Sequence, residues 1–433
     1  PEATDAPEAT DAPETTEEGD GGEAAGAAFV VDTEVCDDPD AATAPIETLK
    51  IGTSIPLSGG PAVLFAPFGA GQQAYIDYYN AENGGIEGTP VELVVKDDQY
   101  TADLTKANVD ELVFDDQVTM LSGIIGSPNN LAIQADMNAQ CIPQLWASTG
   151  APDWGNIDEY PWTTGLLVPY AIEARLWADY VASEIGEGST VGMFYVNNEF
   201  GQAYLEAFEE AAAESGLEIV AEETVDPADS GAPSGQMTNL VEAAPDAILA
   251  VPLGAQCIAF MTELGNAKAA NPDFTPAVYQ TATCASPLFF QATTNGGADG
   301  VFTSTNVKFV DDPAYADDAG VQTFLEAMAT YAPDTTSADL TALAGWLSME
   351  LAVHVAEEAL AAGDYSRAGI INAARNIDYV SPLAMEGGVG QMNLEDGFYA
   401  EATGLVQWSD AAAGFERLGD IIDYNGSLGT YTP

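Results

Sequence analysis

The sequence has very little positive charge. Its 433 residues include 9 Lys and Arg against 69 Asp and Glu, which gives a formal net charge of −60 at pH 7. Binding to nucleic acids or to anionic membranes depends on clustered Lys and Arg side chains. The basic residues are instead scattered along the chain, at Lys50, Lys96, Lys106, Arg175, Lys268, Lys308, Arg367, Arg375 and Arg417. The composition therefore argues against nucleic acid or an anionic membrane as a partner.

The residues and motifs of common catalytic centres are also scarce. His354 is the single histidine, and it shares an expected helical face with Leu347 and Leu351, so we predict that it packs in the core. One histidine leaves too few ligands for a Cys/His zinc site. No GxSxG, SxxK, HExxH or GxxxxGK(S/T) motif and no DxDxDG calcium loop occurs, and adjacent carboxylate pairs are expected by chance among 69 acids. We therefore predict no enzymatic activity, no cofactor and no metal.

Long apolar runs are absent as well. No stretch of roughly 18 apolar residues occurs, so the sequence predicts no membrane-spanning helix. The numbered chain starts at Pro1, without an initiating Met or a hydrophobic signal core, which indicates a processed or truncated chain. We expect any membrane tether to lie upstream of residue 1, as a lipidated cysteine.

The first residues form a near-repeat that lacks apolar bulk. Variants of PEATDA occupy Pro1–Ala6, Pro7–Ala12 and Pro13–Glu18, without an aromatic residue, Leu, Ile, Val or a positive charge. Such a segment cannot bury enough apolar surface to offset the entropy of ordering. We therefore predict a disordered acidic leader over residues 1–45, followed by a compact body from Ile46.

From Ile46 onward, β-branched runs alternate with amphipathic stretches. The first half predicts strands at Leu49–Leu57, Val91–Asp97, Val118–Ile125 and Ile142–Ala147, with helices at Gly69–Ala81, Leu104–Phe114 and Asn130–Gln140. The rhythm restarts with a helix at Val168–Ile185 and strands at Thr190–Val196, Leu217–Val225, Ala247–Val251 and Ala277–Thr281. This alternation predicts an α/β fold of two doubly wound lobes, each with a parallel sheet. Ligands bind at the carboxyl ends of such strands, so we expect the site between the lobes, unless the lobes are independent domains without a shared cleft.

Four cysteines are present, and none belongs to a CxxC motif. An even count in an exported protein favours two disulfides over free thiols. Cys257 and Cys284 follow two strands of the second lobe, and adjacent parallel strands bring such positions within bridging reach. This pairing leaves Cys36 with Cys141, and it is one of three possible connectivities.

Six short motifs resemble one family, in its order. The segment Lys50–Pro61 (KIGTSIPLSGGP) is similar to the first strand and loop of type I periplasmic binding proteins of the Leu/Ile/Val-binding (branched-chain amino acid/amide) branch, which serves ABC importers. Further matches lie at 81–88 (AENGGIEG), 94–99 (VVKDDQ), 123–127 (GIIGS), 146–152 (WASTGAP) and 198–202 (NEFGQ). Each motif alone is weak, but their order and spacing are specific. The resemblance covers about 46–423.

The resemblance implies two lobes joined by a hinge of three crossings, near Trp162–Gly165, Val301–Ser304 and Leu383–Gly388. Lobe one would comprise residues 46–163 with 303–383, and lobe two residues 164–302 with 384–433. The implied function is that of an extracytoplasmic solute-binding protein, extracellular or periplasmic and tethered as a lipoprotein. It would pass a small-molecule ligand to an ABC transporter permease. The alternative is a surface structural or adhesive protein that reuses this fold.

Carried over by position, the resemblance also implies the ligand contacts. In lobe one these are Ser127, Ala147, Ser148 and Thr149, although the hydroxyls of Ser127 and Thr149 could simply cap helices. Phe65 and Phe68 would form an aromatic wall in the loop after the first strand, or a hydrophobic staple for the next helix. In lobe two the candidates are Phe200, Gln256 and Thr283.

The loops around the expected site indicate the charge of the ligand. Amino-acid binders of this family usually carry an acid after the strand that aligns with Ala277–Thr281, but residues 280–285 and 253–257 contain no carboxylate. A buried ammonium without a counter-charge is unfavourable, unless Glu199 or another acid substitutes. No Lys or Arg lies in these loops either. We therefore expect a neutral or singly negative ligand such as an amide or a small organic acid, with a branched-chain amino acid as the family default.

Overall fold

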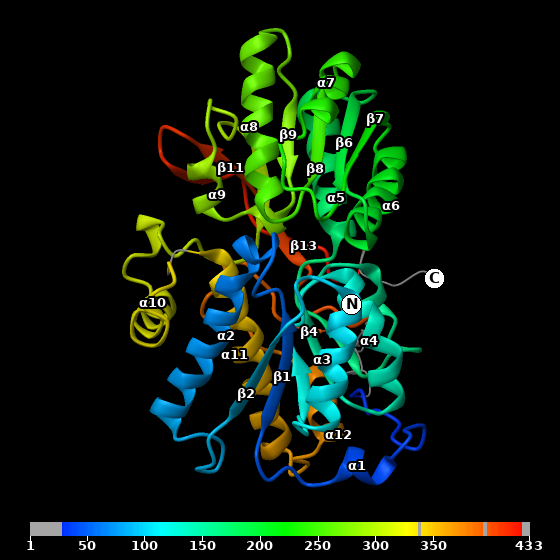
Figure 1. Cartoon of the computed structure of the whole chain (residues 1–433), viewed down its shortest axis with the longest axis vertical. Coiled ribbons are helices and arrows are strands. Elements are labelled where there is room, and N and C mark those ends of the chain that lie inside the picture. The colour runs from blue at the N-terminus through cyan, green and yellow to red at the C-terminus, as the bar shows by residue number, and fades with distance from the viewer. Residues whose placement is uncertain (1–27, 337–338, 393–395, 427–433) are drawn as a thin grey trace, which may run out of the picture.

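The computed structural model describes residues 28–336, 339–392 and 396–426. The three PEATDA-like repeats lie outside these residues. Two α/β lobes stack along the long axis of the molecule, and Figure 1 shows the earlier half of the chain mainly in the lower lobe. The predicted fold class, two parallel-sheet lobes, is confirmed.

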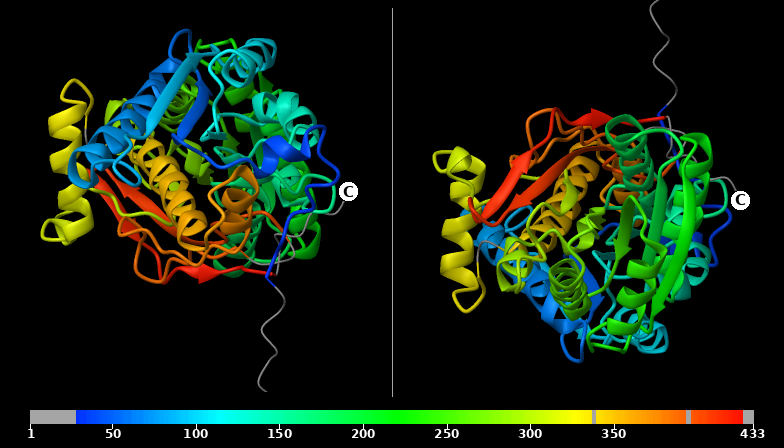
Figure 2. Two further views of the ribbon diagram at one scale, coloured as in Figure 1. Left: turned by 90° about the horizontal axis from the view of Figure 1, so that it is seen from below. Right: turned by 90° about the horizontal axis from the view of Figure 1, so that it is seen from above.

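Lobe one is built on a five-stranded parallel sheet with the order β2-β1-β3-β4-β5. Its strands are β1 Lys50–Ile55, β2 Glu92–Asp97, β3 Met120–Ser122, β4 Gln144–Ala147 and β5 Thr163–Gly165. Its helices are α1 Pro39–Thr43, α2 Ala62–Asn83, α3 Ala102–Phe114, α4 Ser127–Ala139, α10 Ala319–Tyr331, α11 Leu340–Ala361 and α12 Arg367–Arg375. Helices α2 and α11 pack tightly on each other, and α3 packs on α4. Figure 2 shows α10 at the outside of the molecule, beside α2.

Lobe two contains the larger sheet, with the order β12-β11-β10-β9-β8-β6-β7. Its strands are β6 Thr190–Val196, β7 Glu218–Val225, β8 Ala247–Val251, β9 Ala277–Gln280, β10 Phe302–Thr305, β11 Ala402–Ser409, β12 Gly414–Arg417 and β13 Ile422–Asp423. Its helices are α5 Tyr170–Tyr180, α6 Glu199–Glu214, α7 Ser234–Ala243, α8 Ala255–Ala270 and α9 Pro287–Ala292. Strands β6 to β10 are parallel, whereas β11 pairs antiparallel with β10, β12 and β13.

The chain crosses between the lobes three times. It leaves lobe one after β5, returns after β10 and crosses again just before β11. Strand β10 belongs to the sheet of lobe two, so the second crossing follows Thr305, directly after the expected Val301–Ser304. The third crossing also comes later than the predicted 383–388, because Tyr399 and Ala400 still pack in the core of lobe one. Residues 384–400 lack the alternating apolar pattern that marks a strand, so no local signal in the sequence indicates where the third crossing lies.

The body of the protein begins before Ile46. Val31, Cys36 and Ala42 are buried in the core of lobe one. The backbone N–H of Val31 donates to Asn372 Oδ1 at 2.7 Å, which fastens this segment to α12. The predicted leader of residues 1–45 is therefore too long at its C-terminal end. The reason is visible in the sequence, because the apolar stretch that starts at Phe29 differs from the PEATDA repeats.

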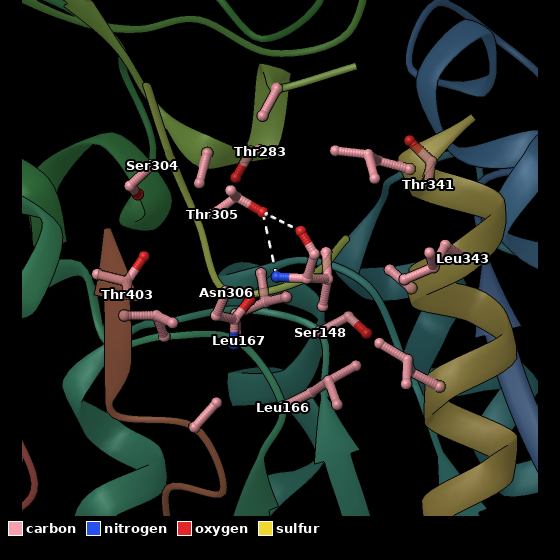
Figure 3. A pocket seen from close by; sticks show the side chains of 18 of the residues that line it. Ser148, Leu166, Leu167, Thr283, Ser304, Thr305, Asn306, Thr341, Leu343 and Thr403 are labelled. Carbon is pink, nitrogen blue, oxygen red and sulfur yellow. Dashed lines mark hydrogen bonds between the residues drawn. The ribbon is translucent and has the colours of Figure 1, made fainter. Parts of the chain in front are cut away.

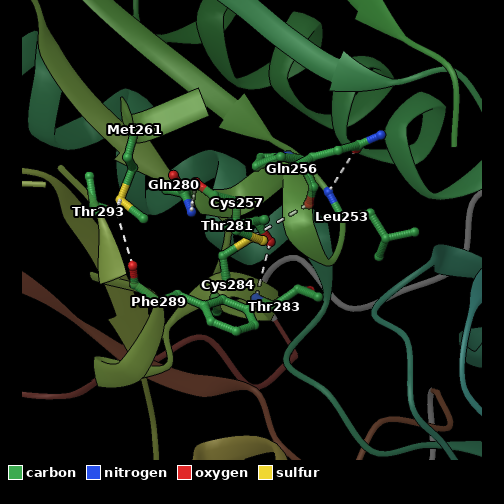
Figure 4. Close-up of a disulfide and its surroundings, with 12 residues drawn as sticks. Leu253, Gln256, Cys257, Met261, Gln280, Thr281, Thr283, Cys284, Phe289 and Thr293 are labelled. Atoms are coloured by element: carbon green, nitrogen blue, oxygen red, sulfur yellow. Dashed lines mark hydrogen bonds between the residues drawn. A yellow bond between two sulfur atoms is a disulfide. The ribbon is translucent and has the colours of Figure 1, made fainter. Parts of the chain in front are cut away.

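Two disulfides occur in the structure, with the pairings that the sequence favoured. Cys36 pairs with Cys141 at a Cα–Cα distance of 5.5 Å and joins the segment before β1 to the residues before β4. Cys257 pairs with Cys284 at a Cα–Cα distance of 5.9 Å. Figure 4 shows this second bridge between the start of α8 and the turn that follows β9. It therefore fixes two neighbouring loops at the carboxyl end of the sheet of lobe two.

His354 lies on α11, and its ring stacks on Tyr379 with the ring centroids 4.1 Å apart. Burial lowers the pKa of His354, although Glu358 and Glu357 act in the opposite direction. The histidine therefore packs as a neutral aromatic group. None of the helices in the described part of the chain is both long and apolar enough to cross a membrane.

The charge excess predicts a strong dependence of stability on salt. A net charge of −60 repels itself in the compact state, and raising sodium chloride from about 0.1 M to about 1 M shortens the screening length from about 10 Å to about 3 Å. We expect the melting temperature to rise by roughly 5 °C or more over this range. Differential scanning calorimetry measures the melting temperature. The increase should largely vanish near pH 4, close to the isoelectric point of about 4.1. A salt response that is equal at pH 4 and at pH 7 would contradict this prediction.

Candidate functional site

A cavity of about 180 Å³ lies between the two lobes, at the carboxyl ends of their strands. Lobe one contributes Phe65, Phe68, Tyr100, Gly126 and Ser148, and lobe two contributes Tyr170, Glu173, Phe200, Thr283 and Ser286. The start of α11 and the crossing after β10 close one side. Figure 3 shows Thr341 and Leu343 on α11 facing this side, with Ser148, Leu166 and Leu167 below and Thr283 and Thr305 above. The predicted position of the site, in a cleft shared by both lobes, corresponds to this cavity.

The predicted contact residues fall into two groups. Those that line the cavity are Phe65, Phe68, Ser148, Phe200 and Thr283, and those that do not are Ser127, Ala147, Thr149 and Gln256. Phe65 and Phe68 lie in the first turns of α2 rather than in a loop, because this helix starts at Ala62 and continues through Pro67. They face the cleft from a rigid helix.

Tyr170 explains why two predicted hydroxyls lie outside the cavity. Ser127 Oγ and Thr149 Oγ1 are 2.6 Å apart, and the Tyr170 hydroxyl lies 3.2 Å from Thr149 Oγ1. Tyr170 starts α5 in lobe two, so this chain of hydroxyls connects the lobes. Burial raises the pKa of Tyr170 to about 12, so the phenol stays neutral and can donate. The hydroxyls of Ser127 at the start of α4 and of Thr149 after β4, which the resemblance assigns to a ligand, are thus engaged by the protein itself.

Gln256 holds loops together. Its Oε1 accepts from the backbone N–H of Leu253 at 3.1 Å. Its Nε2 donates to the carbonyls of Asp226 and Asp229, at 2.9 and 2.6 Å. The side chain therefore joins the loop after β8 to the loop after β7, and it supports the cleft from behind.

Aromatic rings from both lobes line the opening. Phe65 and Tyr100 stack with their centroids 5.9 Å apart. Tyr170 meets Phe200 edge-on at 5.4 Å and stacks on Tyr204 at 4.2 Å. These contacts fix the rings in place, so the cleft offers preorganised aromatic surface to a ligand.

Glu173 is a site residue that the sequence reasoning missed. It lies in the first turn of α5, is 3% exposed and lines the cavity. Its Oε2 accepts from the Tyr279 hydroxyl at 2.6 Å and from the backbone N–H of Ala282 at 3.0 Å. Burial raises the pKa of Glu173, and hydrogen bonds from Tyr279, Ala282 and Tyr204 partly offset this rise. The carboxyl group therefore sits against the loop after β9, where the sequence itself has no acid.

A signal for Glu173 was present in the sequence. Tyr170, Glu173 and Trp177 are spaced by three and four residues, which places the acid on the buried face of α5. An acid within an otherwise apolar helical stripe is uncommon unless it has partners or a function.

Two further hydroxyls face the same cavity. Ser148 is 9% exposed and Ser286 is 2% exposed, and both line the cavity. Within the described part of the chain, neither Oγ atom has a hydrogen-bond partner. A buried polar group without a partner costs about 1–3 kcal/mol, so each lobe presents one hydroxyl that a ligand can satisfy. For metal binding, no cluster of three or more His, Cys, Asp or Glu side chains is suitably placed among the described residues.

Comparison with known proteins identifies the family. A family model described as "Periplasmic binding protein" matches residues 48–413. No curated protein matches the chain. A branched-chain amino acid ABC transporter protein from Thermus thermophilus with bound valine is 17% identical, with a TM-score of 0.77, and the match covers 89% of this chain and 98% of that one.

Two other solved structures show the same fold. A fatty acid ABC transporter substrate-binding protein from Thermomonospora curvata is 20% identical with a TM-score of 0.73, covering 90% and 98% of the two chains. An R. palustris solute-binding protein in complex with 4-hydroxybenzoate is 16% identical with a TM-score of 0.71, covering 87% and 97%. Because the family model spans most of the sequence and the two lobes have the expected architecture, the chain belongs to the periplasmic binding protein family and has its type I fold.

Proposed function

We propose that the protein is an extracytoplasmic solute-binding protein that captures one small molecule between its lobes and delivers it to the permease of an ABC importer. The observation that carries this proposal is the cavity shared by both lobes, in a chain that belongs to the periplasmic binding protein family. Its lining combines aromatic and aliphatic walls with a few polar groups, as small-molecule sites do. No covalent step is required.

The mechanism is a hinge closure. A ligand that touches both lobes binds the closed form more tightly than the open form and shifts the population toward closure. Three crossings connect the lobes, and ligand binding changes the relative orientation of the lobes. The permease can therefore distinguish the ligand-bound protein from the empty one by this orientation. The solutes named for similar folds are diverse, because the three solved structures concern valine, a fatty acid and 4-hydroxybenzoate. For this chain, a branched-chain amino acid, an amide or a small organic acid are the classes that the family resemblance suggests.

The proposal is tested by mass spectrometry of the undenatured protein isolated from its own cells, combined with small-angle X-ray scattering. We expect a monomer that carries one small molecule, and a radius of gyration that decreases when that molecule is added back to the emptied protein. Stimulation of the ATPase of the reconstituted importer would establish delivery. A protein that assembles on gel filtration and retains no small molecule would instead support the structural or adhesive alternative.

Tyr170→Phe tests the link between the lobes. This substitution removes the hydroxyl that contacts Thr149 across the cleft and keeps the ring. A hydrogen bond contributes about 1 kcal/mol, so the closed form loses stability and the affinity for the native ligand falls about fivefold. Isothermal titration calorimetry measures the change. Tyr180→Phe, on the same helix but outside the cavity, is the control, and an equal effect in both variants would contradict the assignment.

A further inference from the structure

The cavity contains one charged side chain. Glu173 is the single Asp or Glu among its lining residues, and no Lys, Arg or His of the described chain lines it. The known donors to the carboxyl group are Tyr279, Ala282 and Tyr204, which are all neutral. A carboxylate offers about four lone-pair directions, so one direction is left for an N–H group of a ligand. A positive ligand would supply the counter-charge that the protein does not.

A ligand carboxylate would find no cationic partner among the described residues that line the cavity. The hydroxyls of Ser127 and Thr149 are engaged by each other and by Tyr170. The net charge of −60 also repels anions from the cleft and concentrates cations there. Both observations disfavour an acid, and the first also disfavours a zwitterion, because a zwitterion carries a carboxylate too.

The remaining polar groups suit an ammonium head. A primary ammonium has three N–H donors, and the cavity offers acceptors at Glu173, Ser148 Oγ and Ser286 Oγ, of which the two hydroxyls have no partner among the described residues. Tyr100 and Phe200 add aromatic surface, which attracts cations through the ring quadrupole.

The rest of the cavity suits a hydrocarbon chain. Leu340, Leu343 and Leu347 project from successive turns of α11 into its lining, and Val380 and Val389 complete this side. Figure 3 shows Leu343 of α11 beside the central space, with Leu166 below it. This apolar wall lies on the hinge side of the cavity. A ligand hydrocarbon chain that extends from the polar groups around Glu173 would therefore contact both lobes and the crossings.

We propose that the ligand is an aliphatic primary amine without a carboxylate, whose protonated head lies against Glu173 and whose chain lies along the apolar wall of α11. This inference rests on the proposed solute-binding function and specifies the chemistry of that same site. It also revises the expectation of a neutral or singly negative ligand. That expectation applied unless Glu199 or another acid substituted, and α5 brings such an acid, Glu173, to the loop after β9.

The test is a titration series in which only the head group varies. Hexylamine, hexanamide, hexanoate and norleucine have the same six-carbon chain and carry a positive, neutral, negative and zwitterionic head. Calorimetry at about pH 8, where an alkylamine is protonated as lysine is, should show hexylamine binding at least about tenfold more tightly than the other three. Tighter binding of hexanamide, hexanoate or norleucine, or no measurable binding of hexylamine, would overturn the proposal.

Glu173→Gln identifies the residue responsible. The amide oxygen can still accept from Tyr279 and Ala282, so the loop after β9 keeps its support. We expect the affinity for hexylamine to fall at least about tenfold and that for hexanamide to change less than about twofold. Glu350→Gln is the matched control, because Glu350 is also buried and accepts from Tyr379 and Trp346 but does not line the cavity. An unchanged preference for the amine in Glu173→Gln would refute the role of Glu173.

The two proposals fail in different ways. If an unrelated solute co-purifies and closes the lobes while hexylamine does not bind, the solute-binding function stands and the amine proposal is wrong. If neither a co-purified solute nor any member of the series closes the lobes, the solute-binding function itself is contradicted.

Discussion

Replacing Gly345 with alanine is expected to destabilise the protein by about 3 kcal/mol or more. Gly345 lies where α11 crosses α2, and a Cβ atom there would be 2.0 Å from the carbonyl oxygen of Phe68. The contact is reciprocal, because a Cβ at Gly71 of α2 would be 1.9 Å from the carbonyl oxygen of Ala342. Both obstacles are backbone atoms, so a change of rotamer cannot relieve them and the helices must separate.

Gly345→Ala should weaken ligand binding in the cleft as well as the packing of the core. Phe68 lines the cavity from α2, and Leu343 and Leu347 line it from α11. A wider separation of these helices would therefore move two walls of the cavity and weaken ligand binding together with stability.

Urea unfolding followed by circular dichroism measures the effect. Gly235→Ala is the control, because Gly235 lies within α7 and, apart from its chain neighbours and its own helix backbone, no described residue comes within 4 Å of its added Cβ. That variant should be as stable as the parent or more stable by about 0.4–1 kcal/mol. If Gly345→Ala unfolds at the same urea concentration as Gly235→Ala, the close packing of α2 on α11 is not a constraint on the fold.

The regular part of the fold was predictable from local pattern. Strand β6 occupies the predicted residues Thr190–Val196, and β9 differs from its prediction by one residue. These strands are apolar runs between clear turn signals, so local sequence determines them. Helix α2 was predicted to start at Gly69 but starts at Ala62, and Pro67 is accommodated within its first turns.

The site residues in the loops after the strands were easier to predict than the site residues on helices. The loops after parallel strands converge for topological reasons, and the family resemblance assigned Ser148 and Thr283 in these loops to the cleft. Glu173 could not, because its position depends on how α5 packs against β9, and the two meet across 109 residues of sequence. The hydrogen bond between Thr149 and Tyr170 could not be predicted either, since it requires the two lobes to face each other.

A second large effect is expected at Arg375, the last residue of α12. The residue is 1% exposed, and its guanidinium group donates to groups near two crossings of the hinge. The acceptors are the carbonyls of Pro161, Tyr160, Thr163 and Asp396, at 3.2, 3.2, 2.7 and 3.3 Å, and Met392 Sδ at 3.8 Å. The side chain thus holds the approach to the first crossing and the approach to the third in one hydrogen-bond network.

Burial lowers the pKa of Arg375 to about 9, with nearby Asp396 opposing the shift. The group therefore still carries its proton at neutral pH. Arg375→Met keeps the length and the apolar stem but removes every donor, which leaves buried carbonyls without partners. Removing one member of such a buried charged network costs about 3–5 kcal/mol, and we expect a loss in this range.

The stability of Arg375→Met is measured by urea unfolding, and its hinge by small-angle X-ray scattering of the ligand-free protein. Arg175→Met is the control, because Arg175 pairs with Asp179 and Glu214 at the surface, where an ion pair contributes about 1 kcal/mol or less. Arg375→Lys should remain well below the parent protein, since one ammonium group cannot reach carbonyls that a planar fork contacts in several directions. Equal losses in Arg375→Met and Arg175→Met would show that the buried guanidinium does not hold the crossings together.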